Sequence, residues 1–382
     1  MTINLNKPNV VIFANSCWTV LNFRANLLKE LKARGCKVTV VAANDSYRDQ
    51  LTSLGCEFAP IEIKSRGKNL IYECKTLLNA YFLLKKISPD ILLSFTIKPN
   101  IYGSILSPFL GYKVINNITG LGSIFSSNNF LTNLIRLLYK FSFIKSSTVF
   151  FQNSEDMELF LRHGLVKVTQ CERLPGSGVN LEKFRYSPSG KLEGRKFRFI
   201  LIARMLWDKG VADFIDAARI INSKFPNTDF WLLGFLDSEN PAAISESQMK
   251  LMTADGVTTY RGGSRDVLSE LVRADCVVLP TYYKEGVPKS LLEAGAVGRP
   301  IITTNMPGCR DVVDNGVNGY LCQARDPSDL ARNMEKILLL SDEGRLVMGF
   351  NSRKKMELMF DERIVIDKYM KFIRIALKIN KL

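Results

Sequence analysis

Short apolar runs rich in β-branched residues alternate with helix-forming segments along most of this chain, and this alternation limits the folds open to it. In the first half the pattern predicts strands at 10–15, 37–43, 58–63, 91–95, 113–118 and 148–152, with helices ending near 34 and spanning about 70–86. Parallel strands joined by crossover helices form a doubly wound sheet, whose ligand loops follow the carboxyl ends of the strands. We therefore expect an α/β fold in which the loops after Ala14, Phe95 and Ile118 line one site.

A second strand–helix series occupies the other half of the chain. It begins with a strand at 197–203, continues with one at 229–234 and includes a buried strand near 301–304. The segment between 176 and 194 is polar and rich in glycine, as linkers are. With 382 residues the chain is long enough for two domains, each with its own core.

Cysteine and histidine usage argues against a zinc site. The eight cysteines include no C-x-x-C pair and His163 is the only histidine, so we interpret the cysteines as buried thiols in a reducing cytosol. Residues 1–15 lack the long apolar core of a signal peptide, and no run of 18 apolar residues predicts a bilayer-spanning helix.

Positive charge is concentrated in the first half. Residues 1–190 hold 23 Lys and Arg against 12 Asp and Glu, whereas the remainder holds 29 against 25. The segment 91–154 contains no Asp or Glu, although it carries Lys98, Lys113, Arg136, Lys140 and Lys145. An acid-free surface of that length is expected to face phosphates or anionic lipid.

Two glutamates eight positions apart, Glu285 and Glu293, flank a turn and the start of a helix. Pro288 suits the first helical position, so the amides of 289–291 are expected to point from the helix start towards an anion such as phosphate. Glu285 would reach sugar hydroxyls on one side of the phosphate, and Glu293 would reach ribose hydroxyls on the other side. Taken alone, the two residues are also compatible with solvated glutamates on an amphipathic surface helix.

Two cations follow the first strand of the second half. Arg204 and Lys209 lie between that strand and a helix expected to begin near Val211. Cations at the carboxyl end of a strand would neutralise the charge that builds on a departing nucleoside diphosphate. On a loop taken alone, they are as readily solvated surface cations.

The segment from Glu285 to Glu293 resembles the E-x7-E signature of the family-4 retaining glycosyltransferases, which have the GT-B fold. The resemblance extends over 308–320 and over the loop with Arg204 and Lys209. It implies two Rossmann-like doubly wound domains facing a central cleft. Residues 1–180 would form the acceptor-binding, membrane-facing domain and 181–360 the nucleotide-sugar-binding domain, with a helix in 361–382 returning to the first domain.

By this resemblance the catalytic residues are Glu285, Arg204 and Lys209, with Glu285 orienting the donor sugar and the cations stabilising the leaving diphosphate. The donor-binding residues are Gly286, Val287, Pro288, Lys289, Ser290, Leu291, Glu293, Gly234 and Arg261. No D-x-D motif occurs, so no metal is expected to bridge the phosphates and no cofactor is expected beside the UDP-sugar substrate.

The first-domain loops resemble those of a subgroup that extends polyprenyl-diphosphate-linked saccharides with N-acetylated hexosamines, such as N-acetylgalactosaminyltransferases. The candidate acceptor loops are 95–103 and 116–123, and the acceptor-binding residues are Ser16, Trp18, Arg24, Lys98, Asn100, Thr119 and Gly120. Many family members have a histidine near the second loop, where this chain has Thr119 and Gly120. Ordinary turn chemistry and, for the tryptophan, core packing are open alternatives.

A helix over 130–145 has a narrow polar stripe at Thr132, Arg136 and Lys140 and is otherwise almost entirely apolar. One interpretation is a helix that dips into a membrane surface, with Arg136, Lys140 and Lys145 on anionic headgroups. The other is a crossover helix buried against the sheet.

Together these patterns predict a cytoplasmic, retaining and metal-independent glycosyltransferase, peripheral on the inner face of the cell membrane. It would move a sugar, by resemblance an N-acetylhexosamine, from a UDP-sugar to a lipid-linked saccharide in bacterial O-antigen or capsule assembly. A transferase with a soluble acceptor and a nucleotide-sugar epimerase are alternatives on the same architecture. A nucleic-acid-binding protein would explain the basic charge, but no known binding motif occurs, so no nucleic acid partner is expected.

Overall fold

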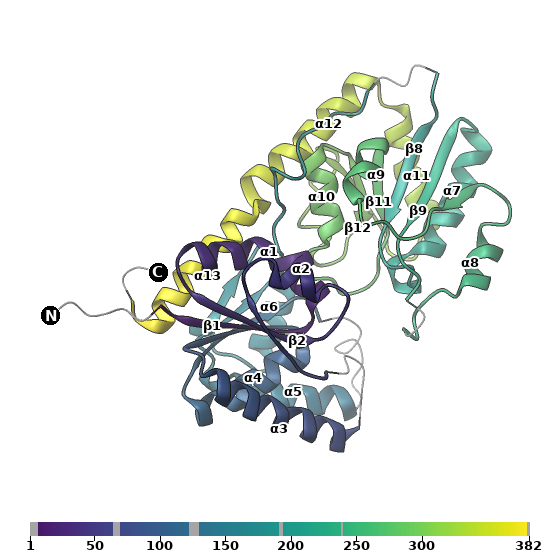
Figure 1. Cartoon of the computed structure of the whole chain (residues 1–382). Helices are drawn as coiled ribbons and strands as arrows, with labels where there is room; N and C mark the ends of the chain where they lie inside the picture. Colours follow the sequence, from purple (N-terminus) through teal and green to yellow (C-terminus); the bar gives the residue numbers. More distant parts are fainter. Residues whose placement is uncertain (1–6, 64–68, 122–129, 191–193, 238–239, 380–382) are drawn as a thin grey trace. The chain divides into compact units, whose positions relative to one another are not determined.

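The computed structural model describes residues 7–63, 69–121, 130–190, 194–237 and 240–379 (Figure 1). They divide into two compact units, one formed by 1–177 with 363–382 and the other by 178–362. Each unit is built around one sheet whose strand pairings are all parallel, as the alternation of strands and helices predicts.

The first unit has a seven-stranded sheet in the order β3-β2-β1-β4-β5-β6-β7. Its strands are β1 (Asn9–Ser16), β2 (Lys37–Ala43), β3 (Glu57–Pro60), β4 (Ile91–Phe95), β5 (Lys113–Ile118), β6 (Thr148–Phe151) and β7 (Cys171–Arg173). The strand order changes direction between β1 and β4. The carboxyl ends of these two strands therefore mark the topological switch point, where doubly wound sheets bind their ligands.

Helices cover both faces of this sheet. One face is covered by α1 (Cys17–Ala33), α2 (Arg48–Thr52) and α13 (Glu362–Leu377), which share a core with Phe95 and Phe150. The other is covered by α3 (Leu70–Ile87), α4 (Ile97–Leu110), α5 (Phe130–Ser142) and α6 (Ser154–Arg162), around Phe13 and Phe151. Helices α3, α4 and α5 lie side by side on that face (Figure 1).

The second unit has a six-stranded sheet in the order β10-β9-β8-β11-β12-β13. Its strands are β8 (Phe197–Ile202), β9 (Thr228–Leu233), β10 (Thr258–Tyr260), β11 (Cys276–Leu279), β12 (Ile301–Thr304) and β13 (Gly319–Cys322). Its helices are α7 (Val211–Lys224), α8 (Glu246–Met252), α9 (Val267–Arg273), α10 (Lys289–Val297), α11 (Pro327–Leu339) and α12 (Asp342–Lys355). The strand order changes direction between β8 and β11, so their carboxyl ends form the switch point of this unit.

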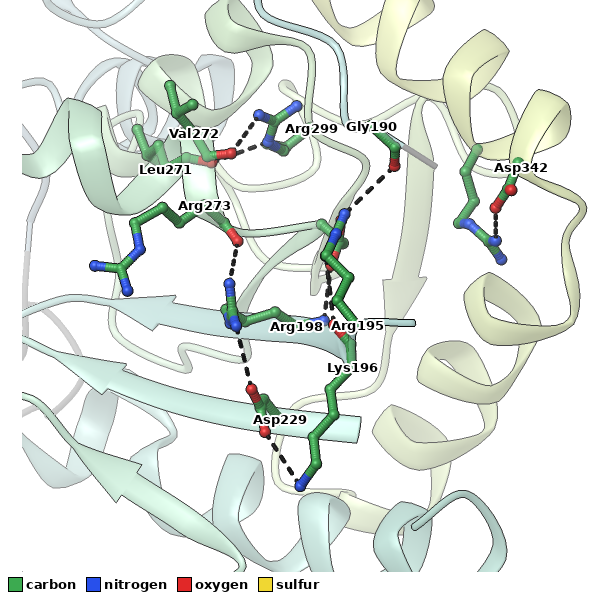
Figure 2. A network of polar contacts seen from close by, with 12 residues as sticks. Gly190, Arg195, Lys196, Arg198, Asp229, Leu271, Val272, Arg273, Arg299 and Asp342 are labelled. Carbon is green, nitrogen blue, oxygen red and sulfur yellow. Dashed lines mark hydrogen bonds and ion pairs between the residues drawn. The ribbon is translucent and has the colours of Figure 1, made fainter. Parts of the chain in front are cut away.

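The amino ends of the second sheet are held by a network of cations (Figure 2). Arg195 donates to both oxygens of Asp275, at 2.6 and 2.7 Å, and Arg198 pairs with Asp229 at 3.3 Å. Arg299 is fully buried and donates to two backbone carbonyls in the last turn of α9, at 2.9 and 3.0 Å. Burial lowers the pKa of Arg299 to about 10. These cations stabilise the fold at the ends of the strands opposite to Lys209.

The loop conformation predicted for 95–103 is wrong, because Lys98 and Asn100 lie in helix α4. Their role in acceptor binding stays a prediction. Pro99 and Gly103 disfavour a helix, so the sequence does not predict one here. Pro99 falls in the first turn, where a missing N–H breaks no hydrogen bond. A Cβ on Gly103 would lie 2.6 Å from the side chain of Leu92, so glycine allows the helix to pack closely on β4. In the second predicted loop, 116–118 belong to β5 and 122–123 lie outside the described residues.

No helix in the described parts of the chain combines the length and the hydropathy needed to cross a membrane.

Candidate donor and acceptor sites

Two loops at the switch point of the second unit are joined through one carbonyl group. The backbone oxygen of Asp208 accepts hydrogen bonds from the amides of Tyr282 and Tyr283, at 3.0 and 3.1 Å, and from the hydroxyl of Thr281 at 3.0 Å. Gly210 permits this approach, since a Cβ there would lie 2.2 Å from a carbonyl oxygen of the facing loop. The loop after β8 is thus fixed against the loop after β11.

This arrangement brings Lys209 and Glu285 into contact as an ion pair. Their side chains are only 12% and 14% exposed. The ammonium group also lies 4.9 Å from the centre of the Tyr283 ring. Burial, reinforced by the charge of Arg204, lowers the pKa of Lys209 to about 8. An incoming anion would favour the protonated form, so the site suits a phosphate group.

Arg204 lies on the same loop but is exposed. Its guanidinium pairs with Asp237 at 3.2 Å. Exposed ion pairs contribute about 1 kcal/mol or less, so a ligand can replace this one at little cost.

Helix α10 begins at Lys289, and Pro288 is its N-cap with φ −64° and ψ 119°, one position before the expected one. The amide of Leu291 donates to the Pro288 carbonyl at 3.1 Å, which corrects the expectation that it is available to an anion. Ser290 is the second residue of the helix, so its amide has no partner within the helix. It lies at the positive end of the helix dipole, where phosphates bind.

The turn before α10 is fixed by a close contact with Gly308. This glycine has φ 78°, and a Cβ on it would lie 1.4 Å from the carbonyl oxygen of Gly286. Val287 in the same turn is buried. Only glycine at 308 leaves room for the turn that carries Glu285, which gives a physical reason for this part of the sequence pattern.

Glu293 is buried in α10, with its carboxylate 3.6 Å from the Lys289 ammonium. Burial raises the pKa of Glu293, opposed by the charges of Lys289 and Lys183. Burial likewise lowers the pKa of Lys289, opposed by Glu293. Since both Glu285 and Glu293 are largely buried, the alternative of two solvated glutamates on a surface helix is wrong.

The other two predicted donor residues lie on the β9–β10 side of the sheet. Gly234 follows β9, and a Cβ on it would lie 1.6 Å from the carbonyl oxygen of Ala203. Arg261 stacks on Trp231 with 4.2 Å between its guanidinium carbon and the ring centre, and pairs with Glu270 at 3.2 Å. These contacts do not include Lys209 or Glu285, so a donor contact of Arg261 stays a prediction.

Sequence reasoning missed Asp208, which lies directly before Lys209. Its carboxylate is half-buried, and Oδ1 has no hydrogen-bond partner among the described residues. Burial raises its pKa, opposed by Lys209 and Arg204. Its position between two basic residues of the same loop is the signal in the sequence that points to it.

At the end of β1 in the first unit, Ser16 caps α1, with its hydroxyl accepting from the Thr19 amide at 3.2 Å. Trp18 is 42% exposed and meets the Phe23 ring edge-on at 5.9 Å. The alternative that this tryptophan packs in the core is therefore wrong. Its exposed ring is available to a sugar.

Lys98 and Asn100 both lie near the start of α4 and differ in environment. Lys98 pairs with Glu73 at 2.5 Å, and Tyr102 donates to the same carboxylate. Asn100 is fully buried: its Oδ1 accepts from Ser94 at 2.8 Å and its Nδ2 donates to the Asn117 carbonyl at 2.9 Å. Asn100 thus ties α4 to β4 and β5, which gives it a role in the fold.

Arg24, Thr119 and Gly120 complete the predicted acceptor set. Thr119 and Gly120 are half-buried just after β5. Arg24 is 4% exposed, and its guanidinium carbon lies 4.7 Å from the centre of the Phe95 ring, at the end of β4.

Helix α5 has one face in the core and one in solvent. It ends at Ser142, three residues before the expected end, and Phe143–Lys145 form a short 3-10 helix after it. Thr132, Tyr139 and Phe143 are buried, so the predicted polar stripe is wrong at Thr132: helical spacing places it with the aromatic residues that pack inward. Lys140 and Lys145 are exposed, and Arg136 is half-buried. Leu137, Leu138, Phe141 and Ile144 are also exposed. The helix is therefore not wholly buried against the sheet, and its exposed face carries both apolar and basic side chains.

In the described parts of the chain, no group of three or more His, Cys, Asp or Glu side chains is placed to hold a metal ion.

Comparison with known proteins identifies the family. Residues 182–355 match the family described as "Glycosyl transferases group 1", and residues 9–153 match "Glycosyl transferase 4-like". The N,N'-diacetylbacillosaminyl-diphospho-undecaprenol alpha-1,3-N-acetylgalactosaminyltransferase of Campylobacter jejuni is 30% identical over 92% of this chain and 95% of its own length. The UDP-Gal:alpha-D-GlcNAc-diphosphoundecaprenol alpha-1,3-galactosyltransferase of Escherichia coli is 27% identical, covering 76% of this chain and 79% of its own.

Solved structures share the fold. A glycosyltransferase from Rickettsia africae has a TM-score of 0.79 at 15% identity, covering 98% of this chain and 99% of its own. HepE of Anabaena in complex with UDP has a TM-score of 0.76 at 16% identity, covering 96% and 99%. The expected GT-B architecture of two Rossmann-like domains is confirmed. The chain therefore belongs to the glycosyl transferases group 1 family and is a two-domain glycosyltransferase.

Proposed function

We propose that this glycosyltransferase moves a sugar from a UDP-sugar to a polyprenyl-diphosphate-linked saccharide, with retention of the anomeric configuration and without a metal ion. The observation that carries the proposal is the buried Lys209–Glu285 pair in the same loop system as the start of α10. It combines a cation for a diphosphate with a carboxylate for a sugar. The two relatives named above, which are described as acting on diphospho-undecaprenol-linked sugars, support the choice of acceptor.

The donor diphosphate would bind between Lys209, Arg204 and the start of α10. Ser290 would donate its backbone amide, and Arg204 would exchange Asp237 for a phosphate oxygen. As the bond to the sugar breaks, charge builds on the leaving diphosphate, and these donors are already in place to stabilise it. Two cations and a helix dipole supply what a bridging metal would otherwise supply, which supports metal independence.

Glu285 and Glu293 would hold the two ends of the donor. Glu285 would accept hydrogen bonds from hydroxyls of the transferred sugar and orient it for attack. Glu293 would accept from the ribose hydroxyls. Buried carboxylates are strong acceptors because they have few water molecules to displace. Retention follows from the family resemblance alone.

The acceptor would bind at the carboxyl ends of the first sheet. Trp18 presents an exposed ring on which a sugar can stack, and Lys98 is a cation near the start of α4, which follows β4. We keep Ser16, Thr119 and Gly120 as lining residues of this site. We assign Asn100 to holding the site rather than to contact, since its polar atoms are engaged in the fold.

The protein would reach its lipid-linked acceptor from the cytoplasmic face of the membrane. The outer face of α3, α4, α5 and the 3-10 helix after α5 (Phe143–Lys145) exposes apolar side chains and lysines. The apolar residues are Ile71, Leu78, Phe82, Phe109, Leu137, Phe141 and Ile144. The lysines are Lys75, Lys85, Lys86, Lys140 and Lys145. A face with both features fits an anionic bilayer, into which apolar side chains insert while lysines meet headgroups.

Thermal shift with a panel of UDP-, GDP- and ADP-sugars tests the donor assignment. A donor present at 100 times its dissociation constant stabilises the protein by about 2.7 kcal/mol. Stabilisation by UDP-sugars alone supports the proposal, whereas a preference for GDP- or ADP-sugars contradicts it. An epimerase would convert the donor without any acceptor, and an enzyme with a soluble acceptor would transfer equally well to an acceptor without lipid.

A further inference from the structure

Arg24 is a buried cation with few partners. It lies on α1 and is 4% exposed. Its Nη1 donates to the carbonyl oxygen of Phe23 at 3.2 Å, while Nε has no hydrogen-bond partner among the described residues. Among the described residues Arg24 forms no ion pair with a carboxylate, and the hydroxyl of Tyr369 is the titratable group near its guanidinium. Buried charges are usually paired, so an uncompensated guanidinium calls for an anion.

The buried arginine of the second unit provides a contrast. Arg299 donates to two backbone carbonyls at the end of α9 (Figure 2). The charge of Asp275 also raises the pKa of Arg299, against the lowering by burial. Its role in the fold is clear, because it caps a helix and lies far along the strands from the switch point. Each guanidinium has one nitrogen without a described hydrogen-bond partner, Nη1 in Arg299 and Nε in Arg24. Arg24 differs in having a single carbonyl partner and no carboxylate of the described residues close to its charge.

Arg24 also lies where a doubly wound sheet binds ligands. Its guanidinium stacks on Phe95, the last residue of β4. Long side chains on a helix lean towards the helix amino end, and the amino end of α1 follows directly from β1. The guanidinium is therefore at the carboxyl ends of β1 and β4, the switch point of the first sheet.

Further polar atoms without hydrogen-bond partners lie at the carboxyl ends of neighbouring strands in this sheet. Asn15, next to last in β1, has an Oδ1 with no hydrogen-bond partner among the described residues. Asn117, next to last in β5, donates to Tyr369 at 2.7 Å, but its Oδ1 likewise has no described partner. Thr96, directly after β4, has φ 71°, a strained conformation for a β-branched residue. Such strain concentrates at functional sites.

We propose that Arg24 binds a phosphate oxygen of the acceptor's diphosphate at the carboxyl ends of β1 and β4. This rests on the proposed function, which assigns the donor's own diphosphate to the second unit. The guanidinium offers a planar fork of donors that matches phosphate geometry. Asn15 would accept a hydrogen bond from a hydroxyl or amide of the sugar attached to that diphosphate. Arg24 is thereby the residue that distinguishes a lipid-diphosphate acceptor from a neutral glycoside.

Binding of three short-chain probes tests this assignment without requiring turnover. The probes are citronellyl diphosphate N-acetylglucosamine, the corresponding monophosphate and the neutral citronellyl glycoside, each titrated by calorimetry into the full-length protein. Wild type should bind the diphosphate most tightly. Arg24→Met should weaken the diphosphate probe about 10- to 100-fold, the loss of one or two charge-assisted hydrogen bonds, and leave the neutral probe within twofold. Arg24→Lys should retain part of the preference. Arg299→Met is the control for loss of a buried arginine and should keep the preference unchanged.

Three results would overturn the assignment. Equal weakening of charged and neutral probes by Arg24→Met would mean that the arginine only packs α1 against β4. Weakening of UDP binding instead of acceptor binding would place the guanidinium at the donor's diphosphate. If Arg24→Met does not fold, Arg24→Lys decides: a lysine variant that prefers the diphosphate probe as strongly as wild type does would mean that the guanidinium does not bind it. Probe binding that depends on Arg24 without any sugar transfer would contradict the proposed function and leave the assignment standing.

Discussion

Lys209 and Glu285, which are 76 residues apart in the chain, form a largely buried ion pair at the switch point of the second unit. The loop after β8 supplies the cation and the loop after β11 the carboxylate, and the carbonyl of Asp208 holds the two loops together. The pair fixes the positions of both charged groups. When a nucleotide-sugar binds, its diphosphate would take the place of Glu285 beside Lys209. The hydroxyls of its sugar would take the place of Lys209 beside Glu285.

Replacing the carboxylate by its amide tests the role of Glu285. We expect Glu285→Gln to lower kcat by about 100- to 1,000-fold, the usual effect of removing one preorganised contact to the transition state, with the KM for the donor little changed. Steady-state kinetics measure this. Stability should fall by about 1–3 kcal/mol, because Lys209 loses its partner. Glu335→Gln, which breaks the exposed pair with Lys224, is the matched control and should keep wild-type rates. Comparable kcat in the two variants would remove Glu285 from the mechanism.

The pKa of Lys209 predicts two dependences on pH. The folded pKa is about 8, below the ordinary 10.5, so between these values the unfolded chain binds a proton that the folded one does not. The free energy of unfolding of wild type should therefore rise relative to Lys209→Met as the pH increases from 8 to 10.5. Affinity for UDP should fall above pH 8 in wild type, by at most about tenfold per pH unit, and stay flat in the variant. Urea denaturation and calorimetry across this range check both, and parallel curves for the two proteins would refute the assignment.

Much of the architecture could be predicted from the sequence because buried parallel strands are short, apolar and β-branched. Strands β1, β2, β4, β5, β8 and β9 fall within about a residue of the expected limits. Helix α4 was missed because Pro99 and Gly103 disfavour helices locally, whereas the position of the proline in the first turn and close packing on Leu92 remove both objections. Tertiary contacts therefore determine that this segment is a helix.

The sequence identifies residues of the candidate site, but it does not show which of them contact one another. Spacing within one loop–helix segment drew attention to Glu285 and Glu293, yet nothing local indicates that Glu285 meets Lys209. That contact depends on which strands are neighbours in the sheet. The burial of Arg24 was likewise hidden, since an arginine on an amphipathic helix is usually exposed. Thr132 was misassigned because its side chain is polar, although helical spacing aligns it with Tyr139 and Phe143.

Chelation tests metal independence. We expect activity to survive EDTA, because Arg204, Lys209 and the start of α10 together provide the positive charge that the leaving diphosphate needs. Transfer is assayed before and after chelation, with magnesium or manganese added back. Complete loss on chelation that either metal restores would contradict the proposal.

Membrane docking is tested by liposome sedimentation. At about 1 kcal/mol for each basic residue near an anionic surface, changing Arg136, Lys140 and Lys145 to alanine should weaken binding to phosphatidylglycerol vesicles by about 100-fold at low salt. High salt should remove most of the difference. Phe141→Ser should also weaken binding, because its exposed ring would insert among the acyl chains.

The controls for docking lie in the second unit. Leu251→Ser removes an exposed apolar side chain from α8, and a triple alanine change at Lys196, Lys250 and Lys354 removes the same charge as the first variant. Neither should alter sedimentation. If control and test variants behave alike, the face formed by α3, α4 and α5 is not the docking surface.

The most direct test of the account is transfer of labelled sugar to a lipid-linked acceptor. Purified protein is incubated with a radiolabelled UDP-N-acetylhexosamine and citronellyl diphosphate N-acetylglucosamine, and label is counted in the organic extract for wild type, Glu285→Gln and Glu335→Gln. We predict that label enters the extract only when donor and acceptor are both present, in wild type and Glu335→Gln but not in Glu285→Gln. Conversion of the donor without acceptor, or equal transfer by Glu285→Gln and wild type, would contradict the account.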